Sequence, residues 1–206
     1  MTTATLLVFI STFAFVSITP GMCMMLSLTL GMTIGVRRTL NMMVGELVGV
    51  GLVASLSVMG VAAIMVATPE FFWVFKGLGG AYLVWLGIQM WQSRGKLSVP
   101  TDTTGFVPPT ARSLATQGFV TAVANPKGWA FFMALLPPFL NPAEPLGKQM
   151  LWLLAIILTL EFLSLVLYAS GGRMLSTFLR QASNVRVMNR IAGTLMVGVG
   201  VWLWSG

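Results

Sequence analysis

The sequence contains no histidine, one cysteine and few charged residues, and each shortage excludes a class of protein. Charged residues make up 8% of the 206 residues and hydrophobic residues 56%, whereas roughly a quarter of the residues in a soluble domain are charged. A chain with so few charges cannot cover a water-facing surface, so a soluble globular protein and a disordered protein are both excluded. The length fits a single domain or two small halves.

The missing residue types also exclude most sites that catalyse reactions or bind metals. Zinc sites, His-based catalytic triads, haem attachment, CxxC redox motifs and intramolecular disulfides need residues that the chain lacks. Cys23 is flanked by methionines, but neighbouring residues of a helix point to different faces and cannot meet at one copper ion. The apolar runs contain no nucleophile–base pair. We therefore expect neither an enzyme nor a cofactor or metal site.

Long apolar runs dominate the rest of the chain. Residues 1–36 carry no charged side chain. A helix of that length would extend ~50 Å, more than the ~30 Å hydrocarbon thickness of a bilayer, so the run must tilt, protrude or break. The expected break is at Pro20-Gly21. Five further runs lie at about residues 40–67, 71–91, 113–136, 146–170 and 187–204. We therefore predict an all-α membrane protein with six transmembrane helices.

Two halves of the chain carry matching features. The third and sixth runs share three residues at a constant offset of 113 positions, namely Gly80, Gly87 and Trp91 against Gly193, Gly200 and Trp204. Pro20 in the first run and Pro126 in the fourth lie at a similar offset and predict that helices 1 and 4 are both broken. The alternative, that Gly and Trp are simply common in membrane helices, stays open.

This pattern predicts one transmembrane domain, residues 1–206, built from two repeats of three helices. The first repeat covers about 1–93 and the second about 113–206, and a polar linker at about 94–112 joins them. Because each repeat has an odd number of spans, the two face opposite ways across the bilayer. Inverted repeats of this kind, with interrupted helices at matching positions, are typical of secondary transporters.

Arginine and lysine are distributed unevenly between the loops. Lys148, with Lys76 nearby, lies on one side of the predicted membrane. The loops on the other side, after the first, third and fifth runs, hold Arg37, Arg38, Arg94, Lys96, Arg112, Arg173, Arg180 and Arg186. Basic residues favour the cytoplasmic side, so both termini are predicted to lie outside. This placement accounts for the net charge of +7 without a nucleic-acid partner.

The two broken helices are the first candidates for a binding site. A break frees backbone groups that lipid cannot satisfy, so it is tolerated where protein or a water-filled cavity lines it. The half-helix that begins after a break presents N–H groups and a positive dipole end to a carboxylate. A proline kink without a ligand is the structural alternative at each break. The predicted substrate-binding residues there are Thr19, Pro20, Gly21, Asn125, Pro126 and Lys127.

Ionisable residues well inside the spans are the second candidates, because each is costly in a membrane. They are Glu46, Lys127 and Glu161. Lys127 is the natural counter-ion of one carboxylate, most simply Glu161, which leaves the other for a substrate amine or a proton. Both glutamates are therefore predicted to bind substrate and to couple transport to protons. A Glu–Lys pair that only orients helices, and a Glu46 side chain that snorkels to the interface, remain as alternatives.

The order and spacing of several motifs resemble the lysine exporter and homoserine/threonine exporter superfamily (LysE/RhtB type). The resemblance covers nearly the whole chain and rests on these segments: Thr19-Pro20-Gly21, Gly31, Gly35, Arg37-Arg38, Gly45-Glu46, Gly77 to Gly87, Gly118-Phe119, Asn125-Pro126-Lys127 and Leu136-Pro137-Pro138-Phe139. The family's Pro-Gly motif usually continues with a proline, where this chain has Met22. The family's pairing of an acid with Tyr-Ala is similar to Glu161 with Tyr168-Ala169, which implies a substrate-binding role for Tyr168.

The resemblance implies efflux of amino acids or similar metabolites across the inner membrane of a bacterium, driven by the proton gradient. We expect alternating access, in which a zwitterion leaves the cytoplasm with its carboxylate at a broken helix and its ammonium on a glutamate. The alternative is a metal-cation exporter of the same superfamily, for which Glu46, Glu161 and Cys23 are too few ligands unless backbone carbonyls join them. Exposed Gly and Met faces are compatible with a homodimer.

Overall fold

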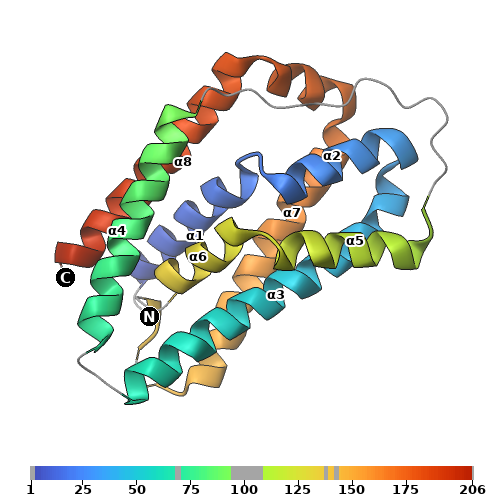
Figure 1. Ribbon diagram of the computed structural model, residues 1–206. Helices are drawn as coiled ribbons and strands as arrows, with labels where there is room; N and C mark the ends of the chain where they lie inside the picture. The colour runs from blue at the N-terminus through green and yellow to red at the C-terminus, as the bar shows by residue number, and fades with distance from the viewer. Residues whose placement is uncertain (1–2, 68–70, 94–108, 137–138, 142–143, 206) are drawn as a thin grey trace.

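The computed structural model describes residues 3–67, 71–93, 109–136, 139–141 and 144–205, and the regular structure within these ranges is helical (Figure 1). The helices in chain order are α1 (Thr3–Ile18), α2 (Met22–Ile34), α3 (Val36–Ala67), α4 (Phe71–Gln92), α5 (Ala111–Val123), α6 (Pro126–Leu135), α7 (Leu146–Arg180) and α8 (Ala182–Ser205). The chain is thus an all-α protein.

A helix is broken at each of the two proline sites, as the sequence predicts. α1 ends at Ile18 and α2 begins at Met22, and the two helices are bent by 54°. α5 ends at Val123, and α6 begins at Pro126. Proline lacks the N–H that a continuing helix needs, but it is accommodated in the first turn of a new one. The breaks leave α1 and α6 in the middle of the molecule, with α2 and α5 beyond them (Figure 1).

Helix ends elsewhere differ from the predicted runs. α7 continues to Arg180, ten residues beyond the predicted end at 170, and α8 begins at Ala182 rather than near 187. Inside α7, Gly172 has φ +45°, so the helix is kinked there, and its long apolar segment ends at the kink. A positive φ of this size is favoured by glycine because it has no Cβ.

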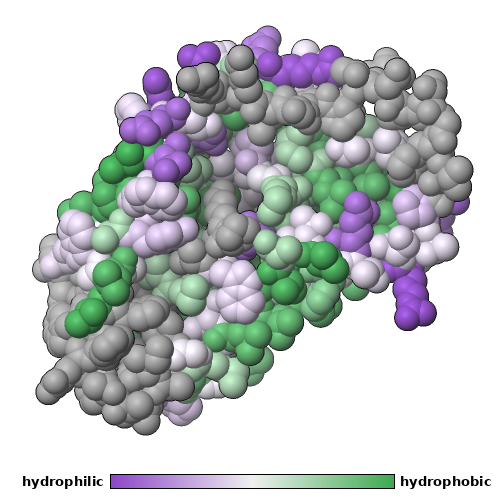
Figure 2. Space-filling model, in the orientation of Figure 1, coloured by the Kyte–Doolittle hydropathy of each residue, from purple (hydrophilic) through white to green (hydrophobic). Residues whose placement is uncertain are grey.

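The described residues contain two helical segments long and apolar enough to cross a membrane, Val36–Gly60 in α3 and Leu146–Gly172 in α7. The bent pair α1 and α2 makes a third if it is counted as one broken span. The six spans of the sequence analysis therefore stay a prediction. An exposed apolar stripe on α3 fits a lipid-facing helix, with residues spaced four apart: Leu40, Val44, Val48, Leu52 and Leu56. Figure 2 shows hydrophobic residues across the middle of one face and hydrophilic ones along its upper edge.

α4 and α8 cross through reciprocal pairs of glycines. A Cβ added to Gly80 would lie 2.9 Å from the carbonyl oxygen of Gly200, and one added to Gly200 would lie 2.7 Å from that of Gly80. Gly87 and Gly193 are related in the same way, at 2.6 and 2.5 Å. Small residues let helix backbones approach this closely in membranes. Because Gly80 pairs with Gly200 and Gly87 with Gly193, the two helices run antiparallel.

The buried side chains form two apolar clusters. One gathers around α1, α3, α6, α7 and the α4–α8 pair and includes Phe13, Val53 and Phe131. The other gathers where α2, α3, α5 and α7 meet and includes Cys23 and Met24. Residues of both clusters line one cavity.

Candidate binding cavity at the two broken helices

A cavity of about 80 Å³ lies between the two breaks. One water molecule needs about 15 Å³ of such volume, so the cavity has room for roughly five. Six elements supply its lining, namely α1, α2, α3, α5, α6 and α7, together with residues of both breaks. Within the described residues, α4 and α8 contribute nothing to this lining. The breaks thus open onto protein and a space for water, as backbone irregularity in a membrane requires.

One side of the cavity carries two carboxyl groups. Glu46, on α3, has no exposed surface, and Glu161 lines the same cavity from α7. The Ser17 hydroxyl donates a hydrogen bond to Glu161 Oε2, and it lies 3.1 Å from the Ser164 hydroxyl. Ser17 belongs to α1, so this contact joins the end of the first half-helix to α7.

Glu46 is the less satisfied of the two acids. Among the described residues, no donor forms a hydrogen bond to either of its carboxyl oxygens. Glu161 and the Cys23 thiol lie beside it. Two facing carboxylates repel each other, but a proton on one lets it donate to the other, so such a pair holds one proton readily. The arrangement is therefore suited to binding either a proton or a cationic group.

Each break frees a backbone carbonyl, and an aromatic side chain donates to it. The Tyr168 hydroxyl lies 2.8 Å from the Ile18 oxygen, and the Trp129 indole nitrogen lies 2.8 Å from the Val123 oxygen. The last carbonyls of a helix have no partner within it, so these bonds satisfy groups that lipid could not. Tyr168 comes from α7 and Trp129 from α6, so the second break is satisfied from the half-helix that follows it.

Two helix N-termini face the cavity. Gly21 precedes α2 in an extended conformation, with no side chain capping the first turn, and Gly21, Met22 and Cys23 line the cavity. At the second break the lining comes from Asn125 and Gly128. A Cβ added to Gly128 would meet no atom within 4 Å. The cavity therefore has free space next to the start of α6.

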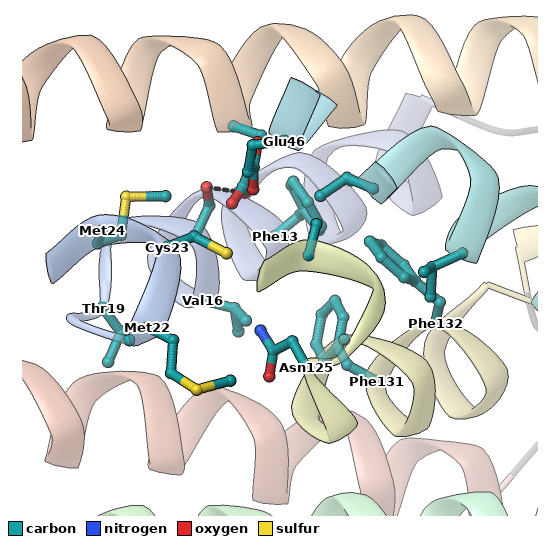
Figure 3. A pocket seen from close by; sticks show the side chains of 17 residues that line it. Phe13, Val16, Thr19, Met22, Cys23, Met24, Glu46, Asn125, Phe131 and Phe132 are labelled. Carbon is teal, nitrogen blue, oxygen red and sulfur yellow. Dashed lines mark hydrogen bonds between the residues drawn. The ribbon is translucent and has the colours of Figure 1, made fainter. Parts of the chain in front are cut away.

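The remaining wall is apolar, and one part of it is aromatic. Phe13 of α1 faces Phe131 and Phe132 of α6, and the three side chains are at most 5% exposed. In Figure 3 these rings lie on one side of the cavity, Glu46 lies above and Asn125 below. The cavity thus offers a carboxyl end, an amide next to a helix start, and an apolar wall.

Five of the predicted site residues line the cavity: Thr19, Gly21, Glu46, Asn125 and Glu161. Pro20 lies at the first break between two of them. Tyr168 is buried and is not among the lining residues, since its hydroxyl is directed to Ile18. Pro126 and Lys127 begin α6, but their side chains lie outside the described residues, so the predicted pairing of Lys127 with Glu161 stays a prediction.

Sequence reasoning missed the hydroxyl partner of Glu161 and the aromatic wall. Ser17 and Phe13 are four residues apart on α1, hence on one face, and both line the cavity. This spacing, just before a predicted break, was the available signal. The metal-cation alternative gains no support, because the part of the chain that the structure describes has no group of three or more Cys, Asp or Glu placed to hold a metal ion.

Comparison with known proteins places the chain among translocators. The family model described as LysE type translocator matches residues 14–206. An uncharacterized membrane protein of Vibrio cholerae is 28% identical over 187 residues, which cover 91% of this chain and 90% of that protein. A homoserine/homoserine lactone efflux protein of Salmonella typhimurium is 26% identical, with 96% and 94% covered. A leucine efflux protein of an Enterobacter species is 25% identical, with 93% and 90% covered. No solved structure matches the chain significantly.

Proposed function

Because the chain belongs to the LysE family of translocators, we propose that it is a secondary transporter that exports amino acids or closely related small metabolites. Two relatives that match along nearly their whole length are named for efflux of homoserine and of leucine. The observation that carries the proposal is the cavity at the two breaks, which combines paired carboxyl groups with a helix start. A zwitterion needs both kinds of group.

The substrate binds with its two charged groups at different sides of the cavity. Its ammonium group lies against Glu46 and Glu161, where the described residues offer Glu46 no hydrogen bond. Its carboxylate lies at the start of α6, where Asn125 and Gly128 line the cavity and the positive end of the helix dipole favours an anion. The start of α2 is the less suitable end, because Cys23 in its first turn already lies beside Glu46.

The same pair of carboxyl groups couples export to protons. An ammonium ion and a proton compete for Glu46 and Glu161, since either one relieves the repulsion between two facing carboxylates. Proton uptake from outside releases the amino acid, and proton loss to the cytoplasm prepares the site for the next one. Substrate and proton then cross in opposite directions.

Alternating access follows from six spans in two inverted repeats, α1–α4 and α5–α8. The reciprocal glycine pairs support this symmetry: a shift of 113 residues takes Gly80 to Gly193 and Gly87 to Gly200, so it converts one pair into the other. The cavity has room for roughly five waters, so the half-helices move apart to admit an amino acid. The protein lies in a bacterial inner membrane with both termini outside, because basic loops stay in the cytoplasm.

Reconstituted transport tests this proposal. The purified full-length chain in liposomes is loaded with unlabelled amino acid, and counterflow of labelled leucine and homoserine is measured with and without a pH step. We expect the wild type to accumulate at least one of them. The pH-driven part falls about tenfold or more in Glu46→Gln and in Glu161→Gln, because an amide cannot exchange a proton.

Glu144→Gln is the matched control, since Glu144 is exposed, lies two residues before α7 begins and does not line the cavity. It should transport and respond to pH like the wild type. A pH response that persists in both cavity variants contradicts the coupling role. Absence of counterflow with any amino acid contradicts the export proposal itself.

A further inference from the structure

The cavity has a polar end and an apolar end, and two helices run between them. On α1, Ser17 reaches Glu161, whereas Phe13 lies one turn earlier, about 6 Å away along the axis. On α3, Glu46 is followed by Val50 and Val53, the latter about two turns or ~10 Å further along. Both helices therefore lead from carboxyl groups to apolar side chains.

Three phenyl rings close the apolar end. The centroid of Phe13 lies 5.9 Å from that of Phe131 and 6.1 Å from that of Phe132, and the rings of Phe131 and Phe132 are 5.9 Å apart. Each ring therefore contacts the other two. The rings come from α1 and α6, which are the half-helices on either side of the cavity. We call these three residues the phenylalanine wall.

A zwitterion held at both charged groups directs its side chain toward the apolar part of the lining. The ammonium occupies the carboxyl end and the carboxylate occupies the start of α6. The phenylalanine wall forms one side of what remains, and Met22 and Met24 lie on the opposite side (Figure 3). An ionised side chain there would lose its hydration without gaining a partner from the wall, which is costly. The wall thus favours side chains that are uncharged.

The packing of the rings sets a second limit. The half-helices must move apart to admit any amino acid, but three rings in mutual contact leave no gap among them for a further aromatic ring. Deleting a buried side chain leaves a void that collapses only in part, and an apolar cavity of roughly 150 Å³ accepts a benzene molecule. Removal of one phenyl group from the wall therefore creates space for a larger substrate.

We infer that Phe13, Phe131 and Phe132 are specificity-determining residues that restrict export to amino acids with compact, uncharged side chains. This inference rests on the proposed export function and adds the substrate class. The rings act by filling space at the end of the cavity, so a smaller side chain at either α6 position admits bulkier substrates while the carboxyl end keeps its role.

Competitive counterflow with truncated rings tests the inference. The ratio of initial rates for labelled leucine and labelled phenylalanine is measured for the wild type, Phe131→Ala and Phe132→Ala. We expect the wild type to prefer leucine by about tenfold or more, and each variant to lower this ratio about tenfold, since groups of this size change discrimination by such factors. Lysine remains a poor substrate for all of them.

Phe139→Ala is the matched control. Phe139 is equally buried and its ring lies 5.0 Å from that of Phe9 in the same aromatic cluster, but it does not line the cavity. This variant should keep the wild-type ratio. If an alanine variant fails to fold, Phe131→Leu and Phe132→Leu replace it in the experiment. These variants retain more side-chain volume, so we expect ratios between those of the wild type and the alanine variants.

Two results overturn the inference while leaving amino-acid export intact. One is a wild type that transports phenylalanine or lysine as fast as leucine. The other is a leucine-to-phenylalanine ratio that stays the same in folded variants at positions 131 and 132. Failure of the wild type to transport any amino acid would instead contradict the proposed function.

Discussion

The α4–α8 crossing and the two helix breaks at the cavity place glycine in opposite surroundings. In α4 and α8, Gly80 and Gly87 bring two backbones into contact through reciprocal pairs. At the cavity, Gly21 and Gly128 adjoin free space instead, since an added Cβ would meet almost nothing within 4 Å. The first arrangement holds two backbones in direct contact, whereas the second leaves room for a substrate.

The same contrast holds for backbone hydrogen bonds. α4 and α8 are uninterrupted over their described length. Their backbone N–H and C=O groups therefore bond mostly within each helix. The broken helices depend on donors from other segments, namely Tyr168 at Ile18 and Trp129 at Val123. We infer that α4 and α8 form a fixed frame and that the half-helices move against it.

Gly87→Leu should disrupt the frame and unfold the protein. A Cβ at this position would lie 2.6 Å from the carbonyl oxygen of Gly193, so the two backbones must separate. We expect a loss of more than ~3 kcal/mol in the free energy of unfolding, above the usual cost of an overpacked core. Thermal unfolding of the detergent-purified protein measures it. Gly77→Leu in the same helix, where a Cβ meets nothing within 4 Å, should unfold like the wild type.

Gly128→Leu should block transport without unfolding the protein. The new side chain enters free space beside the cavity, and leucine is a better helix former than glycine. We expect the initial rate of counterflow to fall about a hundredfold, which corresponds to ~2.7 kcal/mol, with an unchanged melting temperature. Gly198→Leu on α8 is the control, because Gly198 also has free space but does not line the cavity. Normal transport by Gly128→Leu would place the substrate elsewhere.

Tyr168→Phe should weaken the first break. The variant leaves the Ile18 carbonyl without its 2.8 Å hydrogen bond while retaining the ring. We expect a loss of about 1–2 kcal/mol in the free energy of unfolding, as for other interhelical hydrogen bonds in membranes. Tyr82→Phe, in the frame helix α4, provides the comparison and should change less. If substrate affinity falls while stability is unchanged, Tyr168 contacts the substrate directly.

Trp91→Phe should have the smallest effect. The Trp91 indole donates to the Thr194 hydroxyl at 2.9 Å across the α4–α8 contact, and Arg190 lies over its ring. Because the residue is exposed, we expect a loss of roughly 0.6 kcal/mol or less and unchanged transport. Unfolding and counterflow on the same preparation check both expectations. A large loss of transport here would mean that the frame takes part in substrate binding.

The sequence predicts the chemistry of the site better than its arrangement. Helix breaks at Pro20 and near Pro126 follow from proline itself, and buried acids stand out in a chain that is 8% charged. The rotation of each helix about its axis is not contained in one sequence, because apolar residues occupy both the lipid-facing and the inward faces. Only the structure therefore shows that Glu46 lies beside Glu161 and that the Tyr168 hydroxyl donates a hydrogen bond to the Ile18 carbonyl.

The central claim, that the amino acid occupies the cavity between the breaks, can be measured through Cys23. It is the chain's one cysteine, and it lines the cavity beside Glu46. The rate at which methyl methanethiosulfonate modifies Cys23 is compared with and without a saturating amino acid that the protein transports. The account predicts that the substrate slows modification about tenfold or more. An unchanged rate at saturation would contradict it.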